Sequence, residues 1–252
     1  MNNITAPAIH ISNARLRYAN KLLFDRLSVS VEAAKFTCLL GPSGVGKTSF
    51  LRLISGLIAP QGQTELTGTV VASDGKPLAN RIAYLAQADL LLPWLTALEN
   101  VIIGAKLRGS KPDLAKAKHL LVQVGLENSM TLRPSELSGG MRQRVALART
   151  LFESRSIVLM DEPFAALDTI NRIKLQELAA TLLVNCTVLL VTHDPLEALR
   201  LGHHIYVMAG QPVTLIELKG LTGSPPRRLD DQTLLHRQAE LLKQLSIAQA
   251  LV

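Results

Sequence analysis

Apolar residues follow two patterns along this chain of 252 residues: short continuous runs and longer stretches with helical spacing. Short apolar runs between polar or glycine-rich segments predict buried strands, and apolar residues three or four positions apart predict amphipathic helices. The predicted strands comprise two within 9–31, around a turn at Asn20 and Lys21, and then 36–40, 69–71, 81–86, 157–160, 187–191, 204–208 and 213–218. Helices are predicted after Lys47 and Pro195 and at about 97–107, 113–124, 138–152, 170–183 and 232–245. Strands that alternate with helices predict an α/β fold with a mostly parallel sheet covered by helices on both faces.

The alternation is interrupted at about 88–152, where three predicted helices follow one another without a strand. Ser138 has the side chain and the position of an N-cap for the third of them. This region predicts a helical subdomain inserted into a domain that extends over 1–222. The segment 223–228 contains two prolines and predicts a linker, so that 223–252 comprises a linker and a C-terminal helix.

A glycine-rich loop with the sequence GPSGVGKT lies between the predicted strand 36–40 and the helix after Lys47. It matches the P-loop, or Walker A, pattern G-x-x-x-x-G-K-[ST], in which backbone amides surround the phosphates of a nucleotide. In this interpretation Lys47 reaches the β- and γ-phosphates and the Thr48 hydroxyl binds Mg²⁺. The residues expected to contact the nucleotide are Gly41, Pro42, Ser43, Gly44, Val45, Gly46, Lys47, Thr48 and Ser49.

Two acidic residues follow the predicted strand 157–160, which can deliver them to the phosphates. Asp161 is expected to hold Mg²⁺ directly or through water. Glu162 is the better candidate for the general base that polarises the attacking water.

Three single residues are candidate site residues because of their positions along the chain. His193 follows the predicted strand 187–191 and is placed to donate to the γ-phosphate, although a lone histidine is more often structural. Gln87 follows the strand 81–86 and is expected to contact the metal or the water. Tyr18 is expected to stack on the nucleotide base, with a core or edge-strand aromatic as the alternative.

A second glycine pair occurs in the sequence LSGGMRQR, where the predicted helix 138–152 begins. The first amides of a helix lack intrahelical partners, and the N-terminus therefore binds anions. A chain with two such sites either binds two phosphates or supplies one site to a partner. Together with the P-loop, Ser138, Gly139 and Gly140 favour a nucleotide sandwiched between two copies of the protein.

In their order along the chain these motifs resemble the nucleotide-binding subunit of an ABC transporter, and the similarity covers nearly the whole chain. The matching motifs are the A-loop-like Tyr18, the Walker A loop, the Q-loop Gln87, the signature Leu137–Gly140, the Walker B acids, the D-loop Ala166–Asp168 and the H-loop His193. The resemblance implies a P-loop NTPase (RecA-like) core, an N-terminal antiparallel β-subdomain and an inserted helical subdomain.

The resemblance also implies hydrolysis of ATP with Mg²⁺ in a head-to-tail dimer. Each ATP would lie between the Walker A loop of one copy and Ser138, Gly139 and Gly140 of the other, and Asp168 would shape the opposite site. ATP would close the dimer and hydrolysis would reopen it. The motion would pass to transmembrane permease subunits near Gln87, which places the protein at the cytoplasmic face of the inner membrane as a peripheral subunit.

The segment 90–101, LLLPWLTALENV, resembles bacterial importers of the nitrate, sulfonate and taurine group, which includes importers of pyrimidine precursors of thiamine. Such importers receive their solute from a periplasmic or lipid-anchored substrate-binding protein. Overall similarity leans toward a hydroxymethylpyrimidine importer, although the solute does not touch this subunit. Trp94 either anchors the permease or packs inside the helical insert.

The net charge of +7 is compatible with nucleic acid, an anionic membrane surface, phosphate ligands or an ordinary solvated surface. The chain has no long basic run with interleaved aromatics, so we expect no nucleic-acid partner. Cys38 and Cys186 lie in apolar runs that predict buried strands, which indicates core thiols in a reducing compartment. No signal peptide or membrane span is expected.

Two other classes of protein are alternatives to the importer. A soluble ABC ATPase of DNA repair or translation would carry a long coiled coil between its Walker motifs or a second ATPase copy, and this sequence contains neither. A regulatory module without hydrolysis would not need Glu162 and His193.

Overall fold

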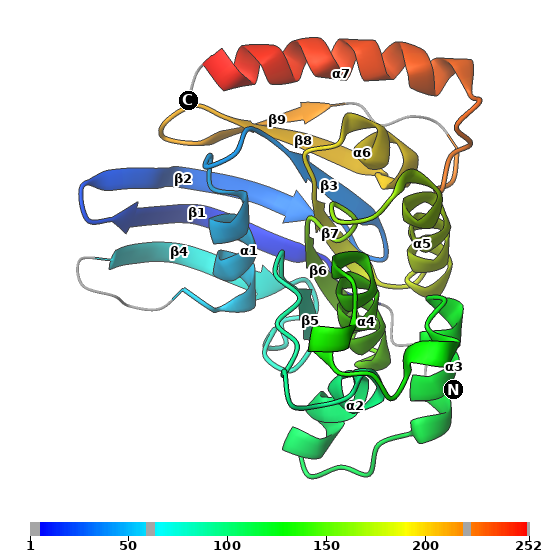
Figure 1. Ribbon diagram of the computed structural model, residues 1–252. Coiled ribbons are helices and arrows are strands. Elements are labelled where there is room, and N and C mark those ends of the chain that lie inside the picture. Colours follow the sequence, from blue (N-terminus) through cyan, green and yellow to red (C-terminus); the bar gives the residue numbers. More distant parts are fainter. Residues whose placement is uncertain (1–5, 59–63, 219–222, 251–252) are drawn as a thin grey trace. The chain divides into compact units, whose positions relative to one another are not determined.

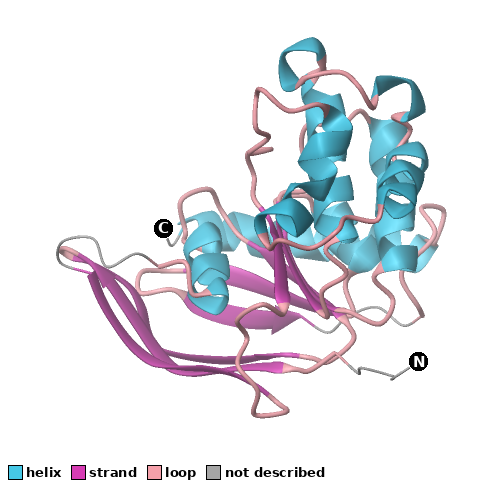
Figure 2. Cartoon of the chain, turned by 90° about the horizontal axis from the view of Figure 1, so that it is seen from below, coloured by secondary structure: helices cyan, strands magenta, loops and turns pink. Residues whose placement is uncertain are grey.

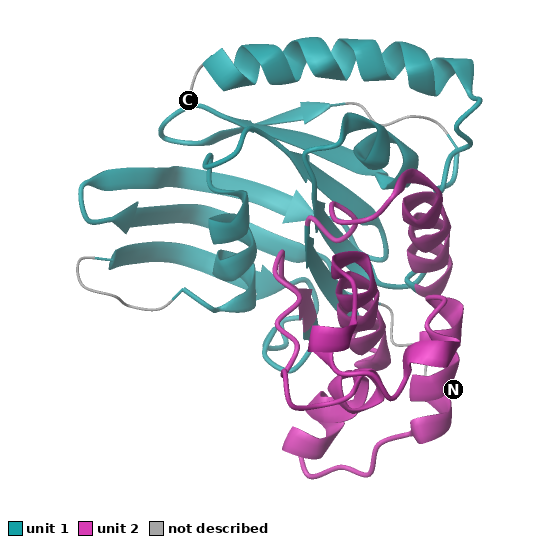
Figure 3. Ribbon diagram, in the orientation of Figure 1, with its two compact units in different colours: residues 1–82, 156–161, 183–252 teal, residues 83–155, 162–182 magenta. Residues whose placement is uncertain are grey.

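The computed structural model describes residues 6–58, 64–218 and 223–250. The chain divides into two compact units (Figure 3). The first unit comprises Met1–Ile82, Ser156–Asp161 and Leu183–Val252, and the second comprises Ala83–Arg155 and Glu162–Leu182. The predicted helical segment 88–152 falls within the second unit, which also contains the helix that follows residue 168.

The described part of the first unit contains an antiparallel sheet and a mostly parallel one (Figure 1). The antiparallel sheet has the order β2-β1-β4 and consists of β1 (Ile9–Tyr18), β2 (Lys21–Val31) and β4 (Thr64–Ala72). In the other sheet the strands of this unit are, in order, β6 (Ile157–Asp161), β7 (Thr187–Val191), β3 (Phe36–Leu40), β8 (His204–Ala209) and β9 (Thr214–Leu218). Every residue of β3, β6 and β7 is buried, as expected for parallel strands covered on both faces.

Three helices belong to the first unit, among the residues described: α1 (Lys47–Ser55), α6 (Pro195–Leu201) and α7 (Gln232–Ala250). Helix α7 packs on α6 and on strand β8 (Figure 1). Strand β5 (Ile82–Leu85) is divided between the units, because Ile82 belongs to the first unit and the rest of the strand belongs to the second.

The second unit, magenta in Figure 3, is mostly helical; the helices of the chain are drawn in cyan in Figure 2. It contains α2 (Ala97–Leu107), α3 (Leu114–Gln123), α4 (Gly139–Phe152), α5 (Thr169–Leu182) and the short 3₁₀ helices η1 (Glu127–Ser129) and η2 (Pro134–Glu136). Helix α4 packs on α2 and α3 through buried aliphatic residues at its centre. Side-chain caps define the helix starts, since Thr96 forms a capping box with Glu99, Asp113 caps α3 and Ser138 caps α4.

The α/β fold predicted from the sequence is confirmed, including the antiparallel N-terminal sheet. Some local predictions were wrong or incomplete. Strand β4 begins at Thr64 rather than at residue 69, because backbone pairing with β1 holds a strand whose side chains are mostly exposed. Helix α7 continues to Ala250. Cys38 is buried in β3 as expected, but Cys186 lies half-buried in the turn before β7 rather than in a strand. Burial raises the pKa of both thiols.

The segment 223–228 is not a free linker. Arg227 within it is buried, and its guanidinium donates to the carbonyl oxygens of Leu199 and Gly202 at 2.7 and 2.9 Å. The two prolines favoured the prediction of a linker because proline interrupts regular secondary structure. Arginine is polar, so the hydrophobic pattern could not indicate that Arg227 is buried.

A bulge in β1 requires glycine on the neighbouring strand. The register between β1 and β4 shifts between Ser12 and Arg15, where Asn13 has a φ of 53°. Gly68 lies opposite with a φ of 94°, and a Cβ there would stand 2.6 Å from the Asn13 carbonyl oxygen and 2.7 Å from Ala14 Cα. Both neighbouring atoms belong to the backbone, so a side chain at Gly68 would displace the bulge.

Gly68→Ala should therefore lower the free energy of unfolding, measured in urea, by about 3 kcal/mol. Gly75→Ala is the matched control, because Gly75 also has a positive φ of 68° but no atom within 4 Å of its Cβ position. The control should lose only the backbone cost of about 1 kcal/mol. Equal losses in the two variants would contradict the steric argument.

Candidate nucleotide-binding site

The glycine loop between β3 and α1 has the tight backbone expected of a P-loop. Gly41 has a φ of 155°, and a Cβ there would approach the Met208 carbonyl oxygen to 2.9 Å. Val45 is buried within the loop and anchors it to the core. Lys47 Nζ donates to the carbonyl oxygens of Gly41 and Pro42 at 2.8 and 2.9 Å, so the lysine side chain lies along the loop. The ammonium group is thus held beside the amides that were predicted to bind phosphates.

Strand order brings three predicted site elements to one edge of the sheet. Strands β6, β7 and β3 are parallel neighbours, and their register aligns Asp161 with Val191 and Val191 with Leu39. The glycine loop begins two residues after Leu39, and His193 lies two residues after Val191. His193 is exposed, and the amide of the preceding Thr192 donates to the Leu39 carbonyl oxygen at 3.1 Å. The carboxyl edge of such a sheet is where ligands bind in open α/β folds.

The two predicted metal ligands of the first unit contact each other. Thr48 Oγ1 donates to Asp161 Oδ2 at 2.7 Å, although 113 residues separate them in sequence. Asp161 is almost fully buried at the end of β6. A hydroxyl and a carboxylate oxygen are ligands of the type that Mg²⁺ prefers, so this pair fits a magnesium ion beside the P-loop.

Glu162 and Gln87, both in the second unit, also meet. Gln87 Nε2 donates to Glu162 Oε2 at 3.4 Å. Glu162 has a φ of 51°, in the left-handed region that a residue with a side chain rarely adopts. Strained backbone of this kind persists only where the surroundings enforce it, and it concentrates at functional sites. The structure thus places the predicted base next to the predicted Q-loop glutamine.

The signature motif forms the start of α4. Ser138 Oγ accepts a hydrogen bond from the Met141 amide at 3.3 Å, and Ser138 and Gly139 are exposed. A Cβ at Gly140 would lie 3.4 Å from the Ala166 carbonyl oxygen, which leaves little room for a side chain beside the D-loop. Asp168, at the end of that loop, accepts from the Asn171 amide at 3.0 Å and from its side chain at 2.6 Å. These hydrogen bonds lower the pKa of Asp168.

Tyr18 is the last residue of β1, paired with Lys21 on one side and Thr64 on the other. Its side chain is half-buried at the end of the antiparallel sheet. Stacking on a nucleotide base stays a prediction.

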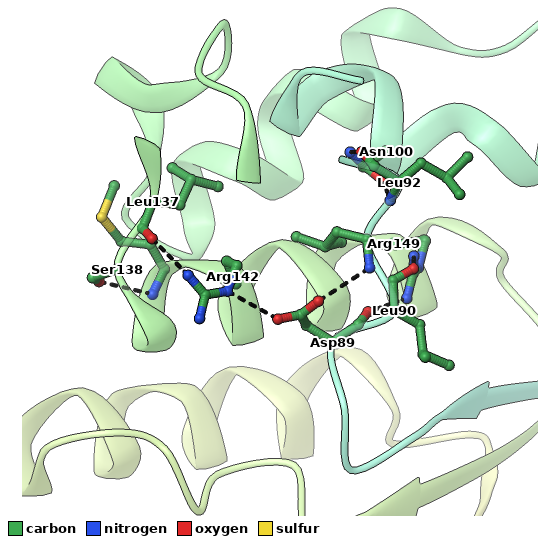
Figure 4. A network of polar contacts seen from close by, with 10 residues as sticks. Asp89, Leu90, Leu92, Asn100, Leu137, Ser138, Arg142 and Arg149 are labelled. Carbon is green, nitrogen blue, oxygen red and sulfur yellow. Dashed lines mark hydrogen bonds and ion pairs between the residues drawn. The ribbon is translucent and has the colours of Figure 1, made fainter. Parts of the chain in front are cut away.

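An arginine network that the sequence analysis missed ties the start of α4 to the segment after Gln87 (Figure 4). Arg142 Nε contacts Asp89 Oδ2 at 3.0 Å, and its Nη1 donates to the Leu137 carbonyl oxygen at 2.9 Å. Arg149 donates to the carbonyl oxygens of Asp89 and Leu90 at 2.6 and 2.8 Å. The available signal was the spacing of seven residues between the two arginines, which puts them on one face of α4.

Asn100 was also missed, and it fixes the loop that carries Trp94. Asn100 is fully buried, accepts from the Leu92 amide at 2.8 Å and donates to the carbonyl oxygens of Leu92, Leu95 and Thr96 at 3.0–3.2 Å. Trp94 at the tip is 66% exposed. The alternative in which Trp94 packs inside the helical insert is therefore wrong.

The strand, glycine loop and helix at this site define a P-loop nucleoside triphosphatase. Residues 24–165 match the family model described as ABC transporter. The chain belongs to the ABC transporter family and is an ATPase of that family. The resemblance inferred from the motifs is confirmed.

Curated relatives match over nearly the full length. An uncharacterised ABC transporter ATP-binding protein of Haemophilus influenzae is 41% identical, and the match covers 94% of this chain and 98% of that protein. The aliphatic sulfonates import ATP-binding protein SsuB of Delftia acidovorans is 36% identical, over 96% of this chain and 95% of that protein. A solved dimeric bacterial ABC transporter cassette is 28% identical, with a TM-score of 0.72 over 84% of this chain and 100% of that one.

In the part of the chain that the structure describes, no helix combines the length and the apolar character that crossing a membrane requires.

Asn100→Ala should release the loop that presents Trp94, because the Leu92 amide and the carbonyls of Leu92, Leu95 and Thr96 each lose a hydrogen bond to the side chain. We expect the free energy of unfolding to fall by about 2 kcal/mol. The fluorescence anisotropy of Trp94, the single tryptophan of the chain, should fall as well. Asn128→Ala, at an exposed position of the same unit, is the control and should change neither quantity. Unchanged anisotropy in Asn100→Ala would show that the loop keeps its conformation without this side chain.

Proposed function

We propose that the chain binds ATP and Mg²⁺ and hydrolyses ATP to drive a bacterial importer of a small organic solute. The observation that carries this proposal is the Thr48–Asp161 contact beside the P-loop, which pairs the two oxygen ligands that a nucleotide-bound Mg²⁺ requires. Within the nitrate, sulfonate, taurine and pyrimidine-precursor group, relatives named for aliphatic sulfonates import support a sulfonate more than a hydroxymethylpyrimidine.

Different residues have different roles in the proposed hydrolysis. The loop amides and Lys47 bind the β- and γ-phosphates, and Thr48 and Asp161 hold Mg²⁺, which neutralises phosphate charge when bound. Glu162 accepts the proton of the attacking water, and Gln87 orients the Glu162 carboxylate through their hydrogen bond. His193 donates to the γ-phosphate from the same sheet edge as the P-loop.

In the proposed head-to-tail dimer, the start of α4 binds the ATP held by the other copy. Exposure of Ser138 and Gly139 supports this role, since Gly139 has no side chain that could cover the start of the helix. A solved relative that is described as dimeric supports the formation of a dimer. ATP would close this dimer and hydrolysis would reopen it.

The proposed partner of the Trp94 loop is a transmembrane permease subunit, served by a periplasmic or lipid-anchored substrate-binding protein. An exposed tryptophan on a loop held by a buried asparagine has the rigidity and apolar area of an interface anchor. This docking would make the chain a peripheral subunit at the cytoplasmic face of the inner membrane.

Glu162→Gln should reduce ATP hydrolysis by about 100-fold or more, because the amide cannot accept the proton of the water. ATP binding should be kept, and an ATP-bound dimer should accumulate, which gel filtration with Mg²⁺ and ATP would detect. Glu127→Gln, at an exposed glutamate, is the control and should hydrolyse normally.

The Glu162→Gln protein also serves to test the head-to-tail geometry of the proposed dimer. Adding Ser138→Arg or Lys47→Ala to Glu162→Gln should prevent dimer formation by either protein alone. A mixture of the two should form heterodimers, because one of the two sandwiched sites is then intact. A Glu162→Gln variant that turns over normally would remove Glu162 from its role, and dimers insensitive to Ser138→Arg would exclude the head-to-tail arrangement.

Trp94→Ala should lower solute uptake about tenfold in vesicles that contain the permease, as expected for an interface anchor worth about 1.4 kcal/mol. ATP affinity should not change, since Trp94 is not a phosphate ligand. Val122→Ala removes another exposed apolar side chain of the same unit and should leave uptake unchanged. Normal uptake by Trp94→Ala would remove Trp94 from the permease interface.

A further inference from the structure

The backbone around His193 is fixed by hydrogen bonds to helix α6, which follows it. Thr192 Oγ1 donates to Glu197 Oε2 at 3.0 Å and accepts from the Asp194 amide at 3.0 Å. The Asp194 carboxylate caps α6 by accepting from the amides of Leu196 and Glu197 at 2.9 and 3.4 Å. His193 therefore lies between two residues that are both bonded to the first turn of α6, and a movement of the helix would carry the imidazole with it.

The other end of α6 is held by Arg227, which comes from the segment that precedes the C-terminal helix. Its Nη1 donates to the carbonyl oxygens of Leu199 and Gly202 at 2.7 and 2.9 Å. The Arg227 amide donates to the Arg200 carbonyl oxygen at 3.0 Å, and Arg200 Nε donates back to the Arg227 carbonyl oxygen at 3.2 Å. The guanidinium thus binds the carbonyls that a helix end leaves without partners, at the negative end of the helix dipole.

A helix of only seven residues has little stability of its own, so its orientation depends on its packing against β3 and α7 and on the contacts that hold its ends. The side chains of Arg200 and Arg227 are both buried, and burial lowers the pKa of Arg227 below its ordinary value. A charge is costly to bury unless hydrogen bonds compensate for the lost water. The contacts at the end of α6 supply that compensation and fix this arginine in place.

We propose that Arg227 is a positioning residue for ATP hydrolysis, which acts through α6 to hold His193 at the phosphate edge of the sheet. The inference rests on the proposed function, because it takes the γ-phosphate as the partner of His193. It gives the segment around Arg227, which precedes helix α7, a role in catalysis within the same protomer, whereas α7 itself packs on α6 and β8.

The test compares Arg227→Ala with Arg228→Ala in the full-length protein. Arg228 is adjacent, carries the same charge and is 85% exposed, with its contacts to Asp230 only two residues away. Arg227→Ala should lower kcat for ATP about five- to fiftyfold, because a displacement of a catalytic group by a fraction of an ångström has effects of this size. KM for ATP should change less than about twofold, since Lys47 and the loop are untouched. Arg228→Ala should match the parent protein in both parameters.

A spectroscopic readout separates positioning from general loss of structure. The imidazole NMR signal of His193, assigned by its absence in His193→Ala, should shift or broaden in Arg227→Ala and stay in place in Arg228→Ala. Arg227→Lys keeps the charge but offers a single ammonium in place of the guanidinium fork, and it should recover part of kcat. If Arg227→Ala does not fold, Arg227→Lys takes its place in both measurements, with a smaller decrease in kcat expected.

The outcomes distinguish this inference from the proposed function. If His193→Ala keeps normal kcat, the role assigned to His193 is wrong and the proposed function fails at that residue. If His193→Ala loses hydrolysis while the Arg227 variants keep kcat and the His193 signal, only the inference is overturned. A parallel loss of kcat, ATP affinity and thermal stability in the Arg227 variants would also overturn it, because a purely structural role predicts that pattern.

Discussion

The parallel hydrogen bonding of β6, β7 and β3 is the constraint on which the site depends. These three strands are buried along their whole length, so their register is fixed by packing on both faces. Because of this register the three strands end side by side, so the glycine loop, Asp161 and His193 lie along one edge of the sheet. The hydrogen bond between Thr48 and Asp161 is possible only because α1 starts from this edge. A slip of one residue in β6 would turn Asp161 toward the other face of the sheet.

Arginine side chains hold much of the remaining backbone in place. Each of the following donates at least one hydrogen bond to a main-chain carbonyl oxygen: Arg142, Arg144, Arg149, Arg172 and Arg227. A carbonyl group carries no net charge, so these hydrogen bonds do not neutralise the arginine, although Arg142 also pairs with Asp89. Part of the net charge of +7 therefore has a structural origin, and the basic balance does not by itself indicate nucleic acid or lipid as a partner.

Sequence patterns predicted those parts of the fold and site whose physical cause is local. A continuous apolar run makes a buried strand wherever it lies, and a glycine loop before a helix requires only the residues from Gly41 to Thr48. The same locality explains why the start of α4 was predicted correctly with Ser138 as its N-cap. Contacts between distant segments were not accessible in this way. Asn100 and Arg227 act on carbonyl groups, which every residue possesses, so the sequence contains no complementary partner to identify.

The two helix starts predicted to bind anions differ in a way that bears on the proposed dimer. Helix α1 begins after Gly46, which has no side chain to cap the first amides of the helix. Helix α4 begins with Ser138, whose hydroxyl already accepts from the Met141 amide. The P-loop therefore combines a helix start that has no side-chain cap with a buried lysine, whereas the start of α4 has a side-chain cap and is exposed. In the proposed dimer, we therefore expect ATP to bind first to the P-loop, and the start of α4 to join only when another copy brings it close.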